Sequence, residues 1–262
     1  MNTQILSLKK LMLAWLVLAA LPVSMAMAAP VAHFARTTGY VTVSTPQAPG
    51  KAASNGMPIA NGATVTTGDN GQAVIKFQDG QVVALQSRSV FRINDYQFNQ
   101  AAPEKGQSFL ALLQGGARIV TGLIGTSNRQ GWKLALPTVT AGIRGTDFLA
   151  LIRDTTSYFK VKVGSIAATN GGGSAVFTAG QNALADNATV VARSVTDAEL
   201  PAGLFGELES MSLTGSLSGP ASGTGASAGA MIGPVPAWAV GLGIGAAVIG
   251  ATIASENNTT SH

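Results

Sequence analysis

The fold class of this 262-residue chain is set by residues 73–85, which read Ala73-Val74-Ile75-Lys76-Phe77-Gln78-Asp79-Gly80-Gln81-Val82-Val83-Ala84-Leu85. Ala73, Ile75 and Phe77 fall on every second position, so an extended chain places them on one face. Asp79-Gly80 then separates two apolar runs. It predicts a two-residue hairpin, because a type I′ turn needs positive φ at both central residues. The stretch therefore predicts an antiparallel strand pair with one face turned to a core.

The same signals recur further along the chain. Residues 159–163 alternate apolar residues with lysines, which predicts a strand whose lysines face outward. Residues 153–156 and 170–173 have the composition of turns. Short strands separated by Gly, Asn and Asp favour an all-β domain, built as a compact antiparallel sandwich or barrel or as a small β-solenoid.

The first 28 residues have the pattern of a secretory signal peptide. Lys9 and Lys10 precede an uncharged apolar run over residues 11–21, and Ala26-Met27-Ala28 fits the small-residue cleavage pattern. The apolar run is short for a bilayer span, although an uncleaved N-terminal anchor is the alternative. We therefore expect export to the periplasm or cell envelope, with residues 1–28 removed.

Three segments are expected to follow a β-domain over residues 29–200. Residues 201–236 are rich in Gly, Ser and Ala; such a segment buries too little apolar surface to offset its ordering entropy, which predicts a flexible linker. Residues 237–254 are apolar and uncharged, and they predict a helix that either spans a membrane or drives self-association through its glycines. Residues 255–262 form a polar tail.

Composition and charge narrow the functional classes. The chain has no cysteine, so disulfides, thiolate zinc sites and thiol nucleophiles are excluded. Residues 30–162 carry thirteen Lys or Arg against six acids, whereas residues 163–262 carry one Arg against six acids. This asymmetry favours anionic partners for the first part. We do not expect nucleic acid as a partner, because export separates the protein from the DNA and RNA of the cell.

The residues give little support to catalysis. The two histidines are His33 and His262, near the mature N-terminus and at the last position, and neither lies in a motif with a nearby acid. The acids read as turn or surface residues rather than as a carboxylate pair, which leaves a cell-wall hydrolase as a weak alternative. No phosphate-binding loop is present. We expect a protein that is not an enzyme and that holds no metal or cofactor.

Four residues are candidates for a binding site. Trp132 follows Gly131 in a predicted loop between Arg129 and Lys133, and Arg118 lies a short distance before it. An aromatic side chain among cations is a plausible contact point on a surface. The alternative for Trp132 is a lid over the core. The expected partner is an envelope protein or an anionic envelope polymer.

One run of residues resembles the signature of the FecR domain family. The run is Gly142-Ile143-Arg144-Gly145-Thr146-Asp147-Phe148, preceded by Pro137-Thr138, and the resemblance covers about residues 35–185. Similar segments are Gly39-Tyr40-Val41, Thr67-Gly68, Gly122-Leu123-Ile124-Gly125 and Ala179-Gly180-Gln181. The resemblance implies an extracytoplasmic β-rich module. In the best-known members, that module relays a signal from an outer-membrane iron transporter to a cytoplasmic sigma factor.

The signature residues are interpreted as structural. Gly142 and Gly145 bracket Arg144 and permit a tight corner, and a guanidinium can donate up to five hydrogen bonds to loop carbonyls. A ligand-binding arginine is the alternative. The expected function is a binding or sensing module of the envelope with a role in signal relay. The alternative is a scaffold protein that assembles through residues 237–254.

Overall fold

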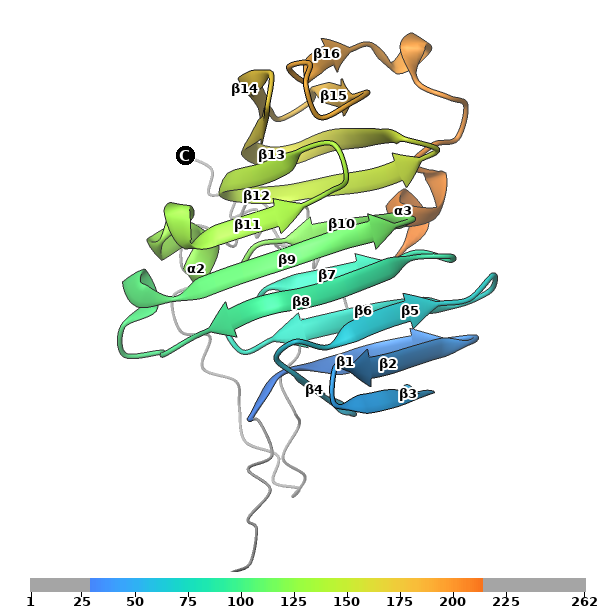
Figure 1. Ribbon diagram of the computed structural model, residues 1–262, viewed down its shortest axis with the longest axis vertical. Coiled ribbons are helices and arrows are strands. Elements are labelled where there is room, and N and C mark those ends of the chain that lie inside the picture. Colours follow the sequence, from blue (N-terminus) through green and yellow to red (C-terminus); the bar gives the residue numbers. More distant parts are fainter. Residues whose placement is uncertain (1–28, 214–262) are drawn as a thin grey trace, which may run out of the picture. The chain divides into compact units, whose positions relative to one another are not determined.

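The computed structural model describes residues 29–213, which form one 16-stranded sheet (Figure 1). The first strands are β1 (Pro30–Thr38), β2 (Val41–Thr45), β3 (Ala48–Ala52), β4 (Pro58–Ala60), β5 (Thr64–Thr67), β6 (Gln72–Phe77), β7 (Val82–Leu85) and β8 (Val90–Gln97). They are followed by β9 (Gln107–Gln114), β10 (Gly116–Val120), β11 (Trp132–Ala135), β12 (Thr140–Arg153), β13 (Thr156–Asn170), β14 (Gly173–Thr178), β15 (Asn182–Ala185) and β16 (Arg193–Val195). The helices are short: α2 (Leu123–Ser127), α3 (Gly206–Ser210) and the 3-10 turns η1 (Pro103–Lys105), η2 (Arg129–Gly131) and η3 (Asp197–Glu199).

The sheet curls so that its two halves face each other across one core. Its strand order is β3-β2-β5-β8-β9-β11-β12-β10-β7-β6-β1-β4. In Figure 1, β8 and β9 lie in front of β7 and β10. Nearly all pairs are antiparallel, but β11 runs parallel to β9. The expected all-β class is confirmed, and the architecture is a single curled sheet.

The chain changes layer at a stack of corners along one end of the sheet. These corners lie between β1 and β2, β5 and β6, β7 and β8, and β9 and β10. The hydroxyl of Thr67 donates to the carbonyl oxygen of Gln86 at 2.6 Å and accepts the N–H of Ser89 at 2.8 Å. The hydroxyl of Ser89 in turn bonds the backbone of Gly116. Buried hydroxyls therefore connect the last three corners, and the N–H of Gly68 donates to the carbonyl oxygen of Tyr40 to connect the first.

The long strands β12 and β13 change layer at the opposite end instead. The first part of β12 pairs with β11, and the part after Gly145 pairs with β10. Its partner β13 bends opposite this point, at Gly164, so its two halves pair with β15 and β14. One hairpin of two bent strands thus belongs to both layers.

The main core lies between the two layers. Alternate residues fill it, as the sequence predicts: Ala73, Ile75 and Phe77 all belong to this core. The residues between them are not all exposed, because Val74 lies in a second apolar cluster on the outer face. The two cores together explain why the run Val82–Leu85 is apolar at every position.

A C-terminal segment, residues 200–213, covers this outer face, and we refer to it as the strap. Its buried residues Leu204, Phe205, Leu208 and Met211 pack on the outward residues of β6, β7 and β12. This differs from the expected linker, whose first thirteen residues belong to the packed structure. Apolar side chains at positions 204, 205, 208 and 211 follow the spacing of one helical face, and the sheet supplies the surface that they need.

The turn between β6 and β7 also differs from the prediction. Phe77 N–H donates to the carbonyl oxygen of Gln81 at 2.9 Å, which closes a three-residue loop rather than a two-residue one. Only Gly80 has positive φ, at 86°. Asp79 is not among the residues with positive φ, as expected for a three-residue loop in which only the last residue is left-handed.

The remaining sequence predictions lie outside the described residues: the signal peptide over 1–28, the rest of the linker, the apolar segment 237–254 and the tail. Within residues 29–213, no helix is long and apolar enough to cross a membrane.

Candidate functional site

The run that resembles the FecR signature forms the bend of β12. Gly145 has φ of 61°, and Gly164 of β13 has φ of 76°. A Cβ added at Gly164 would lie 2.0 Å from the carbonyl oxygen of Gly145, so the two strands approach each other more closely than a side chain allows. Gly142 has no such neighbour: the nearest atom to an added Cβ is 3.9 Å away. Of the two glycines, the bend therefore depends on Gly145.

Arg144 does not satisfy the carbonyls of this bend, contrary to the sequence interpretation. Its side chain is exposed and makes no hydrogen bond or ion pair with any residue in 29–213. The structural ion pair is formed by Arg118 and Asp147. Arg118 Nε donates to Asp147 Oδ1 at 3.0 Å, and Nη2 donates to Oδ2 at 2.6 Å. This bidentate pair joins β10 to β12, with the two side chains 17% and 5% exposed.

Only two of the four candidate binding residues are available at the surface. Arg129 and Lys133 are exposed, and the ammonium of Lys133 lies 5.4 Å from the ring centre of Phe109. Trp132 is fully buried, so it is a core residue and not a surface contact. Arg118 is engaged with Asp147, as described above. The structure thus leaves two exposed cations where the sequence suggests a cluster around an aromatic ring.

A buried polar network lies beneath the β6–β7 turn. The carboxylate of Asp79 accepts the hydroxyl of Tyr96 at 3.0 Å and the N–H groups of Gln81 and Ile124 at 3.1 and 3.2 Å. Burial raises the pKa of Asp79, although these hydrogen bonds oppose the shift, and burial also raises the pKa of Tyr96. The side chain of Gln81 accepts the indole N–H of Trp132. The network fixes β6, β8, β11 and α2 together, so its role is structural.

No catalytic arrangement is found in the part of the chain that the structure describes. His33 is exposed on β1 and has no hydrogen-bonded acid there. Residues 29–213 hold no group of three His, Cys, Asp or Glu side chains that could bind a metal ion.

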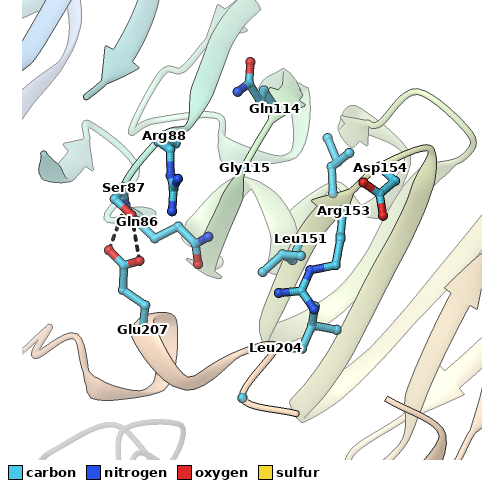
Figure 2. A pocket seen from close by; sticks show the side chains of 12 residues that line it. Gln86, Ser87, Arg88, Gln114, Gly115, Leu151, Arg153, Asp154, Leu204 and Glu207 are labelled. Carbon is cyan, nitrogen blue, oxygen red and sulfur yellow. Dashed lines mark hydrogen bonds between the residues drawn. The ribbon is translucent and has the colours of Figure 1, made fainter. Parts of the chain in front are cut away.

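The candidate site is an open groove at the stacked corners, which we call the corner groove (Figure 2). Its volume is about 650 Å³. It is lined by residues 86–88, 114–115 and 151–154 and, from the strap, by Gly203, Leu204 and Glu207. The groove lies where the β9–β10 corner is formed by Gly115 and Gly116. Gly115 is required there, since its φ is 75° and an added Cβ would lie 2.4 Å from the hydroxyl of Ser89 and 2.5 Å from the carbonyl oxygen of Arg88.

Two arginines face this groove from neighbouring turns. Figure 2 shows the side chains of Arg88 and Arg153 directed into it from its two sides. Arg88 has φ of 52°, and Asp154, next to Arg153, has φ of 55°; these are the non-glycine residues with positive φ within 29–213. Such conformations are costly and often mark functional turns. The sequence predicts the turn at 153–156, but it gives no sign of the one at Arg88.

The strap is attached to the groove through one carboxylate. Glu207 accepts the N–H and hydroxyl of Ser87, both at 2.8 Å, and the side-chain amide of Gln72 at 3.0 Å. Partial burial acts to raise the pKa of Glu207, but these bonds and the nearby Arg88 outweigh it, so the pKa lies below its ordinary value. Sequence reasoning missed Glu207 because it placed this residue in a flexible linker.

The fold and this site define a small all-β module with a polar groove. The sequence model of the family described as FecR protein matches residues 63–167, so this chain contains a FecR domain. The match includes the signature run at the bend of β12, and it ends within β13.

Solved structures give a weaker comparison. Two crystal structures, at 2.50 and 1.65 Å resolution, are described as "a putative anti-sigma factor from Parabacteroides distasonis ATCC 8503". Their TM-scores are 0.41 and 0.40, with 12% sequence identity. The alignment covers 51% of this chain and 59% of those chains, so this chain matches less than two thirds of their length. No curated protein matches the sequence.

Proposed function

We propose that this protein is an exported signal-relay module that binds a partner protein and catalyses no reaction. The observation that carries the proposal is the FecR domain over residues 63–167. The signal-peptide pattern supports an extracytoplasmic location. The buried acids Asp79 and Asp147 give no support to catalysis, since both are engaged in interactions that hold the fold.

Export can be tested by cysteine labelling, because the natural chain has no cysteine. Ser54 is exposed and Ser108 is fully buried, so Ser54→Cys provides a reactive site and Ser108→Cys a matched control. A small sulfonated maleimide that does not cross the inner membrane should label Ser54→Cys in intact cells and leave Ser108→Cys unlabelled. Labelling of Ser54→Cys only after cell lysis would contradict export.

The relay role requires a change in transcription that depends on this protein. A strain that lacks the chain should differ from its parent in a small set of transcripts, and expression of the full chain should restore them. The same experiment tests for chemistry, because a relay module should restore the transcripts with Glu104→Gln or Asp186→Asn, two exposed acids outside the core. An unchanged set of transcripts in the deletion strain would exclude the relay role.

A further inference from the structure

We infer that the corner groove binds an acidic peptide segment of the relay partner, with a carboxylate of that segment held between Arg88 and Arg153. The inference rests on the proposed function, since it names the kind of partner that the module binds. It also replaces the surface that the sequence suggests around Trp132.

The guanidinium groups of the groove are poorly neutralised by the protein. The side chain of Arg153 makes no ion pair or hydrogen bond with another residue in 29–213. Arg88 lies 3.8 Å from Asp69, but the two side chains are 72% and 92% exposed, so solvent screens the pair. The carboxylate of Glu207 interacts with Arg88 as well, but it is already engaged by Ser87 and Gln72 and neutralises Arg88 only in part. A planar carboxylate matches the guanidinium geometry, so it could accept hydrogen bonds from both arginines and neutralise their charge.

The other groups of the groove fit a peptide better than a nucleotide. The side-chain amides of Gln86 and Gln114 make no hydrogen bond within the described part of the chain. The side-chain oxygen of Gln86 is buried, so Gln86 offers its NH₂ group to a peptide C=O, whereas the exposed Gln114 can pair with both N–H and C=O groups. Leu151 and Leu204 offer an apolar contact for a neighbouring side chain. The lining contains no aromatic residue, which removes the stacking surface that nucleobases use. A volume of about 650 Å³ is in the range of small-ligand sites and suits a few residues.

Asp154 limits how much negative charge the ligand should carry. This residue stands on the rim beside Arg153 and would repel a second carboxylate near it. The groove should therefore prefer one carboxylate between neutral residues over a run of acids.

The position of the strap connects binding to the end of the chain. Leu204 and Glu207 line the groove and also attach the strap to the outer face of the sheet. A peptide that contacts both the corners and the strap has a higher affinity for the protein when the strap is packed on the sheet. Peptide binding therefore shifts the equilibrium toward the conformation in which the strap is packed.

Binding can be measured with the full mature chain and three capped hexapeptides. The first carries one central glutamate between leucine and serine residues, the second has glutamine in its place, and the third has six glutamates. Calorimetry should show saturable binding of the first peptide, at least tenfold weaker binding of the second, and weaker binding of the third. Hydrogen exchange over residues 200–213 should slow with the first peptide.

Variants separate the groove from the other basic surface. Arg88→Gln and Arg153→Gln should each weaken the first peptide about tenfold, whereas the control Arg129→Gln with Lys133→Gln should leave it unchanged. All of these side chains are exposed, so thermal melting should show that the variants fold. No binding by the wild type, or an equal loss in the control, would overturn the inference. Preference for anionic lipid vesicles or an anionic glycan over the peptide would also overturn it. These failures leave the transcript test of the relay role unaffected.

Discussion

Removal of one carboxylate should show that Arg118, and not Arg144 as the sequence suggests, is the arginine that stabilises the fold. Asp147→Ala removes both hydrogen bonds to Arg118, at 3.0 and 2.6 Å. The guanidinium of Arg118 is then left largely buried and without a partner for its charge. Arg144→Ala removes an exposed side chain without a partner in the described residues. The structure predicts a large effect for the first change and almost none for the second.

The size of the effect follows from burial. Breaking a buried ion pair by removing one partner costs about 3–5 kcal/mol, because the remaining charge is uncompensated. Arg118 keeps 17% exposure and some access to water, which places the expected loss near the lower end, about 3 kcal/mol. For a domain of this size, the melting temperature should fall by roughly 6–12 °C. Arg144→Ala should stay within about 0.5 kcal/mol of the wild type.

Urea unfolding followed by circular dichroism measures both values. A third protein, Arg118→Met with Asp147→Leu, should recover much of the loss, since it leaves no unpaired charge. The reasoning is refuted if Arg144→Ala loses as much stability as Asp147→Ala, which would return Arg144 to the role that the sequence suggests.

Three further predictions test other parts of the fold. Gly164→Ala should lose about 3 kcal/mol or more, as judged by urea unfolding, because its Cβ would meet a backbone oxygen at positive φ, whereas Gly142→Ala should lose less than 1 kcal/mol. Trp132→Phe should lose about 1–3 kcal/mol in the same assay, since it leaves the buried amide of Gln81 without its donor, and an unchanged midpoint would show that this bond is not needed. The pKa of Glu207 is lowered in the folded state, so its contribution is present above the ordinary value of 4.5 and is lost as pH falls through the folded pKa. Limited proteolysis of the strap should therefore quicken under acid in the wild type and depend less on pH in Glu207→Gln, where the ion pair of Glu209 with Lys160 is the remaining acid-sensitive contact.

The FecR-like run was visible in the sequence, but the role of its arginine was not. Glycines at 142 and 145 indicate a corner, and the corner is present at Gly145. Which arginine is buried depends on the register between β10 and β12, which sets Arg118 beside Asp147. Register between distant strands comes from the packing of the whole sheet, so spacing along the chain cannot supply it.

Local pattern alone determined that this protein is all-β, with strands at 73–77 and 159–163 and turns at 153–156 and 170–173. Period-2 alternation and turn residues act over a few positions, and any sheet that buries one face requires them. Only the tertiary structure decided that β12 and β13 belong to both layers, that residues 204–211 cover the outer face, and that Arg88 and Arg153 line one groove. Each of these features depends on contacts between residues far apart in the chain. The stabilising free energy comes from burying apolar surface of one segment against another, so it cannot be read from either segment alone.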